Sequence, residues 1–290
     1  MRFNTSLIAV FASVLALSSC GKSNNEGSAQ SSSSGGDSFV AVDAAESAAE
    51  IKDVIVDRIK DDYTDKQRNV HIKLVIDFPV NGPQPLLDSI RTYISESLSG
   101  NYKGDLADGR SMVKFYHDFI NKSADECLND MRENFKDDEN APTPAFGQTF
   151  EAKKVYESDK VVTYSFYNEY YCGGMYGALD RCYDLSFFKP SGRFVTVETL
   201  FVNPDSPQLH SLIGRRYKAE CEKDGINFED AAEIHDFSRV PFPMSAPYVT
   251  KDGIAFSYGK YDLNGAFVTF TIKADELSKF MTNEAKAIFD

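Results

Sequence analysis

The residue types that most often perform acid–base or nucleophilic chemistry are scattered along this chain. Its four histidines are His71, His117, His210 and His235, and no two of them are close in sequence. A catalytic site needs such groups in mutual contact, so each histidine is more simply interpreted as a surface or core residue. The sequence also lacks a G-x-S-x-G elbow, an H-E-x-x-H pair and a phosphate-binding loop. We therefore expect no catalytic centre and no cofactor.

The acidic clusters do not form a recognisable metal site. Asp61-Asp62 and Asp137-Asp138-Glu139 lack the alternating ligands and the invariant glycine of a calcium loop. The cysteines include no C-x-x-C pair with a histidine nearby, which disfavours a zinc site. We expect no metal, and we interpret the acidic clusters as solvated turns.

A glycine-rich loop is the best candidate for a binding site. Residues 170–177 read Tyr-Tyr-Cys-Gly-Gly-Met-Tyr-Gly, between segments 161–167 and 181–188 that are rich in tyrosine, phenylalanine and valine. The glycines permit backbone angles closed to other residues, so we expect a hairpin tip. Tyrosine offers an apolar ring and a hydroxyl, which suits a protein edge or a glycan ring. The ligand-binding candidates are Tyr171, Gly173, Gly174, Met175, Tyr176 and Gly177.

The tyrosines of this hairpin should divide between two faces. Alternate residues of a strand share a face, so Tyr167 and Tyr171 should project to one side, and Phe166 and Tyr170 to the other. One of these faces should enter the core. For any single tyrosine, ordinary strand composition remains the alternative to a role in binding.

The N-terminus has the pattern of a secretion signal. Arg2 is the only charge before the apolar run 7–17, which is too short to span a bilayer. Leu17-Ser18-Ser19-Cys20 resembles the lipobox of bacterial lipoproteins, in which the cysteine is lipidated and becomes the mature N-terminus; a secretory signal with a chance cysteine is the alternative. Polar residues then predict a flexible tether. We expect a signal peptide at 1–20, a tether at 21–45 and lipid anchorage in the cell envelope, on the periplasmic face or at the cell surface.

The chain is strongly acidic, with a formal net charge of -13, and loss of residues 1–19 would remove only Arg2 and make it -14. A polyanion repels nucleic acid and acidic lipid headgroups and attracts cationic partners at low salt. We therefore expect no nucleic-acid binding. Maintenance of solubility is the alternative role for this charge.

The cysteines other than Cys20 are even in number, as expected of disulfides in an oxidising compartment, and three pairings are open. We prefer Cys172 with Cys182, because the two bracket the glycine loop. Cys127 with Cys221 would then join two predicted helices.

The rest of the chain alternates between strand and helix patterns. We favour a strand over an amphipathic helix at 51–63, because the alternating segment 69–78 could pair back onto it. The polar, proline-bearing segment 136–144 is the best internal boundary. Helices are predicted at 86–98, 109–135, 206–222 and 275–289, and further strands at 150–157, 161–171, 182–188, 193–197, 248–250, 253–258 and 266–272. We predict an α+β fold, an antiparallel sheet meander with flanking helices in two intimately packed lobes, at 46–140 and 141–290.

The order of motifs is similar to that of a known family. Tyr171-x-Gly173-Gly174-x-x-Gly177 is followed by Asp184-Leu185, Gly192, Leu200-Phe201, Gly253-Ile254-x-Phe256, Tyr261-Asp262-Leu263 and Gly265. This order resembles the extracellular domain of lysozyme-sensing anti-sigma factors of the RsiV type. The upstream half, with Phe78-Pro79 and the helix 86–98, looks like the companion domain found there and in PdaC-like peptidoglycan deacetylases. Together the likeness covers most of residues 50–290.

The resemblance implies an antiparallel sheet with flanking helices, a cell-envelope location and a binding role, with lysozyme as the ligand of the known example. The family loop usually reads Gly-Gly-Ala-His, whereas Met175 and Tyr176 stand in its last two positions here. The sequence also shows no apolar run beyond the signal that could span a membrane, so we do not expect an anti-sigma factor.

These observations together predict an envelope lipoprotein with a non-catalytic binding module. Its ligand would be a protein, such as a cationic lysozyme-like muramidase, or a cell-wall glycan. The alternatives are a peptidoglycan-acting enzyme or its accessory domain, and an envelope assembly or scaffold lipoprotein.

Overall fold

The computed structural model describes residues 53–141, 143–173, 179–226, 237–259, 262–263 and 267–290. Residues 51–290 form one compact unit, and both hydrophobic cores of the protein lie within it. The predicted signal peptide, the lipidation candidate Cys20 and the tether lie outside the described residues. The boundaries predicted at 20 and 45 lie there too, and all three predicted boundaries, at 20, 45 and 140, stay predictions.

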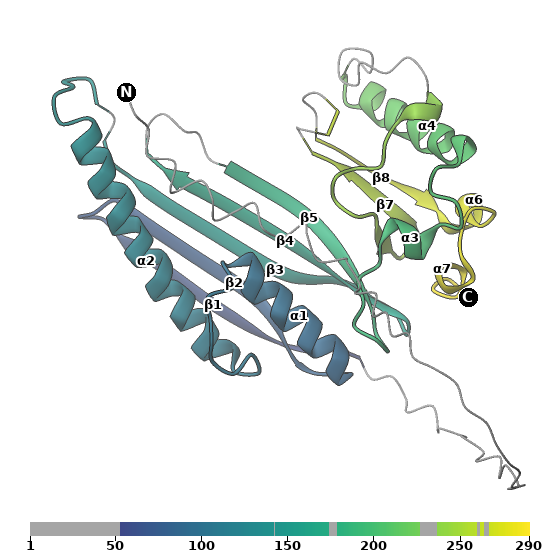
Figure 1. The fold of residues 1–290 in the computed structure, drawn as a ribbon, viewed down its shortest axis with the longest axis horizontal. Helices are drawn as coiled ribbons and strands as arrows, with labels where there is room; N and C mark the ends of the chain where they lie inside the picture. The colour runs from purple at the N-terminus through teal and green to yellow at the C-terminus, as the bar shows by residue number, and fades with distance from the viewer. Residues whose placement is uncertain (1–52, 142, 174–178, 227–236, 260–261, 264–266) are drawn as a thin grey trace, which may run out of the picture. The chain divides into compact units, whose positions relative to one another are not determined.

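A five-stranded sheet with the order β1-β2-β3-β4-β5 forms the first half of the structure (Figure 1). Its strands are β1 (Ile55–Asp65), β2 (Val70–Asn81), β3 (Phe146–Glu157), β4 (Val161–Cys172) and β5 (Leu179–Phe188). Neighbouring strands are antiparallel except β2 and β3, which pair in parallel. Parallel neighbours need a long crossover, and the two helices between β2 and β3 supply it.

The crossover helices α1 (Gln84–Ser97) and α2 (Gly109–Asn134) cover one face of this sheet (Figure 1). Alternation along β2 turns Ile72, Leu74 and Ile76 toward them, and all three side chains are fully buried. The Asp108 carboxylate accepts a hydrogen bond from the Ser111 N–H and so caps α2. Apolar alternation in the strands and helical periodicity in α1 and α2 thus build one core.

A second core lies between α4 (Pro207–Lys223) and a three-stranded antiparallel sheet of β6 (Tyr248–Thr250), β7 (Gly253–Tyr258) and β8 (Val268–Lys273). The Ser206 hydroxyl accepts a hydrogen bond from the Leu209 N–H and so caps α4, and Ile213 and Tyr217 are fully buried on its inner face. Short helical segments complete this half: α3 (Val197–Leu200), η2 (Phe237–Arg239), α6 (Ala274–Leu277) and α7 (Asn283–Lys286).

Hydrogen bonds from β6 connect it to the five-stranded sheet. The Val249 N–H donates to the Ser186 hydroxyl at 2.8 Å, and the Thr163 hydroxyl donates to the Val249 carbonyl at 2.8 Å. Thr163 and Ser186 are fully buried or nearly so. Buried hydroxyls need partners, and here each satisfies a backbone group of the other sheet.

The predicted α+β class is confirmed, as are most predicted strands and helices, but two segments differ. Residues 193–197 form a single bridge, Phe187 with Phe194, because the capping box of Thr196 and Thr199 starts α3 at Val197. The C-terminal segment is two short helices rather than one over 275–289. Between them Met281 bridges Phe201 in extended backbone, which interrupts the helical hydrogen bonds.

Two aspects of the predicted meander also differ. The parallel pairing of β2 with β3 makes the first sheet mixed rather than wholly antiparallel, and it places strands from both sides of the predicted boundary at 140 in one sheet. The three C-terminal strands form a sheet of their own rather than closing the first one.

Candidate functional site

The sheet face opposite α1 and α2 is the broadest candidate surface. Within the described ranges no helix packs on it, and β6 contacts it through Thr163 and Ser186. Along β2, β3 and β4, most side chains that alternate onto this face are half-exposed or exposed, with Asp77 as a buried exception, whereas most of their neighbours toward the helices are buried. We call it the open face, and define it by Arg58, Lys73, Asp77, Gly147, Glu151, Lys153, Ser165, Tyr167, Tyr171 and Asp184.

Two tyrosines of β4 lie on the open face. Tyr167 and Tyr171 are half-buried, while Phe166 is fully buried against the helices, so the predicted division of the hairpin between two faces is confirmed. The register places Tyr167 opposite Glu151 of β3, and Tyr171 opposite Gly147. Gly147 itself contributes no side chain beside Tyr171.

An ionic cluster of Lys73, Glu151 and Lys153 lies beside Tyr167. Lys73 Nζ lies 2.8 Å from Glu151 Oε1, and Lys153 donates to the other oxygen of the same carboxylate. The two lysines hold the pKa of the Glu151 carboxyl below its ordinary value, and Glu151 in turn raises the pKa of Lys73. Glu151 and Lys73 therefore stay charged at neutral pH, and the two lysines hold the Glu151 carboxylate in position.

A second ionic contact on the open face joins the edge strand β1 to its neighbour β2. Arg58 Nε and Nη2 donate to the two oxygens of Asp77 at 2.6 and 2.9 Å, a bidentate geometry. Asp77 is buried, and its second oxygen also accepts from the Lys154 N–H at 3.2 Å. The hydrogen bond and charge of Asp77 raise the pKa of the Arg58 guanidinium.

Asp184 lies on the open face at the opposite edge of the sheet from Arg58. It is on β5, opposite Ser165 of β4. Burial raises the pKa of its carboxyl, an effect opposed by hydrogen bonds from Ser165 and Tyr248. A half-buried carboxyl with two hydroxyl donors is a polar anchor with fixed orientation. The open face thus offers tyrosine rings, fixed charges and hydroxyl groups.

The described start of the glycine loop, at Gly173, is held by a backbone hydrogen bond. Of the predicted binding residues, Tyr171 and Gly173 are described, and Gly174, Met175, Tyr176 and Gly177 lie outside the described residues. The Gly173 N–H donates to the Ala145 carbonyl at 2.9 Å, and its φ is 29°. A Cβ at Gly173 would meet the end of the flexible Met131 side chain, which can shift, so the positive φ is what favours glycine at this position.

The structure corrects the preferred disulfide pairing. Cys172 is bonded to Cys127 of α2, with their Cα atoms 6.2 Å apart, so both the Cys172–Cys182 and the Cys127–Cys221 pairings are wrong. The register places Cys182 opposite Tyr167, which is about 17 Å along the strand from Cys172 at roughly 3.4 Å per residue. That distance is far beyond the reach of a disulfide. Cys221 is instead a thiol in the second core, where burial raises its pKa.

The three described histidines lie on different elements. His71 pairs with Asp62 at 3.2 Å, His117 with Asp61 at 2.6 Å, and His210 Nδ1 lies 2.6 Å from a backbone carbonyl. His235 lies outside the described residues. Across the part of the chain that the structure covers, no three His, Cys, Asp or Glu side chains are grouped to hold a metal ion.

Sequence reasoning missed the charged members of the open face. Lys73, Glu151 and Lys153 sit at alternate strand positions, so the pattern that identified the buried residues also marked these as facing the other way. What the sequence lacked was the β2–β3 register, which brings Lys73 and Glu151 together although they are 78 positions apart.

No protein-family model matches this sequence, and no curated protein matches it either. Solved structures are similar in fold. A member of the DUF3298 family from Bacteroides fragilis NCTC 9343 is 17% identical with a TM-score of 0.63, over 82% of this chain and 99% of that one. A DUF3298 family protein from Pseudomonas aeruginosa PAO1 is 9% identical with a TM-score of 0.55, over 82% and 98%. At these identities the likeness establishes the fold. Among the described helices, none is both long and apolar enough to cross a membrane.

Proposed function

We propose that this chain, which shares its fold with DUF3298 family proteins, is a lipid-anchored envelope protein whose folded part is a non-catalytic binding module. The observation that carries the proposal is the open face, where Tyr167 and Tyr171 lie half-exposed among fixed charges with no helix of the described chain covering them. The lipobox-like Cys20 and the polar tether support the anchorage.

The open face is suited to binding because it is organised before a ligand arrives. Tyrosine rings on strands lose little conformational freedom on binding, and they contribute large contact areas at interfaces. Lys73 and Lys153 already donate to the Glu151 carboxylate, so the charge of that carboxylate is compensated before a ligand lies beside it. The disulfide from Cys127 to Cys172 fixes the end of the strand that carries both tyrosines.

A protein is the first candidate ligand. The net charge of -13 favours a cationic partner at low salt, and the resemblance to lysozyme-sensing domains makes a lysozyme-like muramidase a suitable probe. The family's loop is not carried over intact, since Met175 and Tyr176 replace its last two residues. The ligand of the relatives is therefore a probe rather than an assignment.

A cell-wall glycan is the second candidate, favoured by the setting of Tyr167. Its ring lies opposite Glu151, whose carboxylate is fixed by two lysines. An aromatic ring for the apolar face of a sugar, beside fixed charges for its hydroxyls, is a common arrangement for recognition of a neutral ligand.

The test is capture by a soluble form that begins at residue 38. This form would be immobilised and exposed to host secretions and to cell-wall digests, followed by titration with purified lysozyme and purified muropeptides. We expect saturable binding of one of them, weakened about tenfold or more by Tyr167→Ala or Tyr171→Ala. The matched control is Tyr102→Ala, a half-exposed tyrosine beside α2 on the helical side.

Five results would contradict the proposal. Turnover of cell-wall fragments would favour the enzyme, and cross-linking to envelope neighbours alone would favour a scaffold. Equal losses in Tyr102→Ala and Tyr167→Ala would mean that the open face is not the site. Cytoplasmic retention of the full chain, or the absence of lipid on Cys20 by mass spectrometry, would remove the proposed anchorage.

A further inference from the structure

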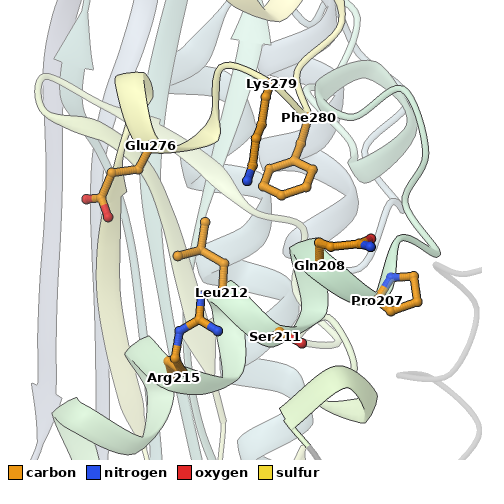
Figure 2. A pocket seen from close by; sticks show the side chains of 8 residues that line it. All are labelled: Pro207, Gln208, Ser211, Leu212, Arg215, Glu276, Lys279 and Phe280. Atoms are coloured by element: carbon orange, nitrogen blue, oxygen red, sulfur yellow. The ribbon is translucent and has the colours of Figure 1, made fainter.

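A pocket of about 640 Å³ lies between α4 and the C-terminal segment around α6, away from the open face (Figure 2). Leu212 of α4 and Phe280 are its principal apolar side chains, and Arg215, Glu276 and Lys279 are its charged ones. Its volume is in the range of pockets that hold small organic molecules. The pocket belongs to the second core and shares no residue with the open face.

The charges around this pocket do not cancel. Glu276 forms an ion pair with Arg216 of α4, so its carboxylate is already compensated. Arg215 and Lys279 also line the pocket, and no carboxylate within the described residues forms an ion pair with either. Arg215 and Lys279 are thus two positive charges that no ion pair among the described residues compensates, in a protein whose net charge is -13. A pocket with uncompensated cations in an acidic protein favours an anionic ligand.

Lys279, one of these two cations, lies against an apolar side chain of the pocket. Lys279 Nζ lies 4.8 Å from the centre of the Phe280 ring, an attractive cation–π contact. In Figure 2 the amine of Lys279 points into the pocket beside this ring, and the guanidinium of Arg215 extends toward Leu212 from the opposite wall. Positive groups on both walls therefore flank an apolar surface.

We propose that this pocket binds a small amphiphilic carboxylate. Its carboxylate would lie between Arg215 and Lys279, and its apolar group against Leu212 and Phe280. Charge-assisted hydrogen bonds from both cations would orient the anion, and burial of the apolar group would add affinity. A compact inorganic anion would leave the apolar walls unused, and an apolar neutral ligand would leave the cations without a partner.

This chemistry has two sources, an acyl chain that ends in a carboxylate and the C-terminus of a peptide with an apolar last residue. The probes are hexanoate for the first and N-acetyl-leucine for the second. Hexanamide and N-acetyl-leucinamide, which keep the shape and lack the charge, are their matched controls. Binding would be measured by isothermal titration calorimetry on the chain from residue 38 onward, which retains both hydrophobic cores.

We expect saturable binding of at least one carboxylate and at least tenfold weaker binding of its amide. Arg215→Gln and Lys279→Gln should each weaken the carboxylate about five- to tenfold, and increasing salt should weaken it further. Both side chains are exposed, so these variants should keep their fold, checked by circular dichroism. The matched control is Lys286→Gln on α7, outside the pocket, which should bind as the unchanged protein does.

A preference for hexanoate assigns the acyl source and a preference for N-acetyl-leucine the peptide source, and either supports the pocket. Three results would overturn the proposed carboxylate site. They are equal binding of acid and amide, no binding of either acid at about 10 mM, which is above the millimolar Kd of weak ligands, and equal losses in Lys286→Gln. The tyrosine variants of the open face should leave this titration unchanged, so the two proposals fail independently.

Discussion

Removal of the Cys127–Cys172 disulfide is the sharpest test of the tertiary structure. The bond joins α2 to the end of β4 and closes a loop with a sequence separation of 45. In the chain-entropy treatment, a loop of this length restricts the unfolded chain by about 13 cal/mol/K, which corresponds to about 4 kcal/mol at 25 °C. We therefore expect Cys127→Ala/Cys172→Ala to reduce the free energy of unfolding by about 4 kcal/mol.

The assay is urea unfolding of the oxidised chain from residue 38, with circular dichroism as the signal. In a domain of this size a loss of about 4 kcal/mol should lower the melting temperature by roughly 8 to 16 °C. Chemical reduction of the unchanged protein should reproduce most of this loss. The control is Cys182→Ser, an exposed side chain outside the bond, which should change stability by less than about 0.5 kcal/mol.

Two results would refute this reasoning. If the double variant unfolds within about 1 kcal/mol of the unchanged protein, the loop closure does not stabilise the fold as calculated. If mass spectrometry of a non-reduced digest links Cys172 to Cys182, the β4–β5 register described above is wrong.

The remaining predictions concern buried and pinned charges. Glu157→Gln should cost about 3 kcal/mol in urea unfolding, because the fully buried Lys189 amine would lose its carboxylate partner at 2.7 Å and keep only Asp53, at 3.4 Å. Adding Lys189→Met should recover part of the loss, and a double variant no more stable than the single one would contradict this. Lys73 and Lys153 lower the folded pKa of Glu151, so its contribution is present above the unfolded pKa of about 4.3 and is lost as pH falls through the lower folded value. Glu151→Gln should therefore flatten the acid side of a stability-versus-pH series, and an unchanged slope would count against the ionic cluster.

Much of the local structure could be predicted because its signals are local. The alternation of Ile72, Leu74 and Ile76 identified β2 and its buried face, and Ser206 marked the start of α4. The C-terminal segment shows the limit of such signals. Leu277, Met281, Ala285 and Ile288 recur at helical spacing and are all buried, yet the backbone between 278 and 282 leaves the helix to bridge Phe201. The periodicity reported burial correctly, but burial alone does not fix the backbone.

The candidate site also contains features that could be predicted from the sequence and features that could not. The sequence indicated that Tyr167 and Tyr171 share a face, since alternation along a strand is a property of the strand itself. It could not indicate that Glu151 lies opposite Tyr167 and is bonded to Lys73, because that depends on the pairing of β3 with both β4 and β2.

The sequence by itself determined the α+β class and the buried faces of most elements, because each depends on neighbours within one or two turns or strands. Only the tertiary structure decided the mixed sheet, the partner of Cys172, the ionic cluster on the open face and the pocket between α4 and Phe280. The physical reason is that several partners are compatible with each local pattern. Register and packing between distant segments select one of them.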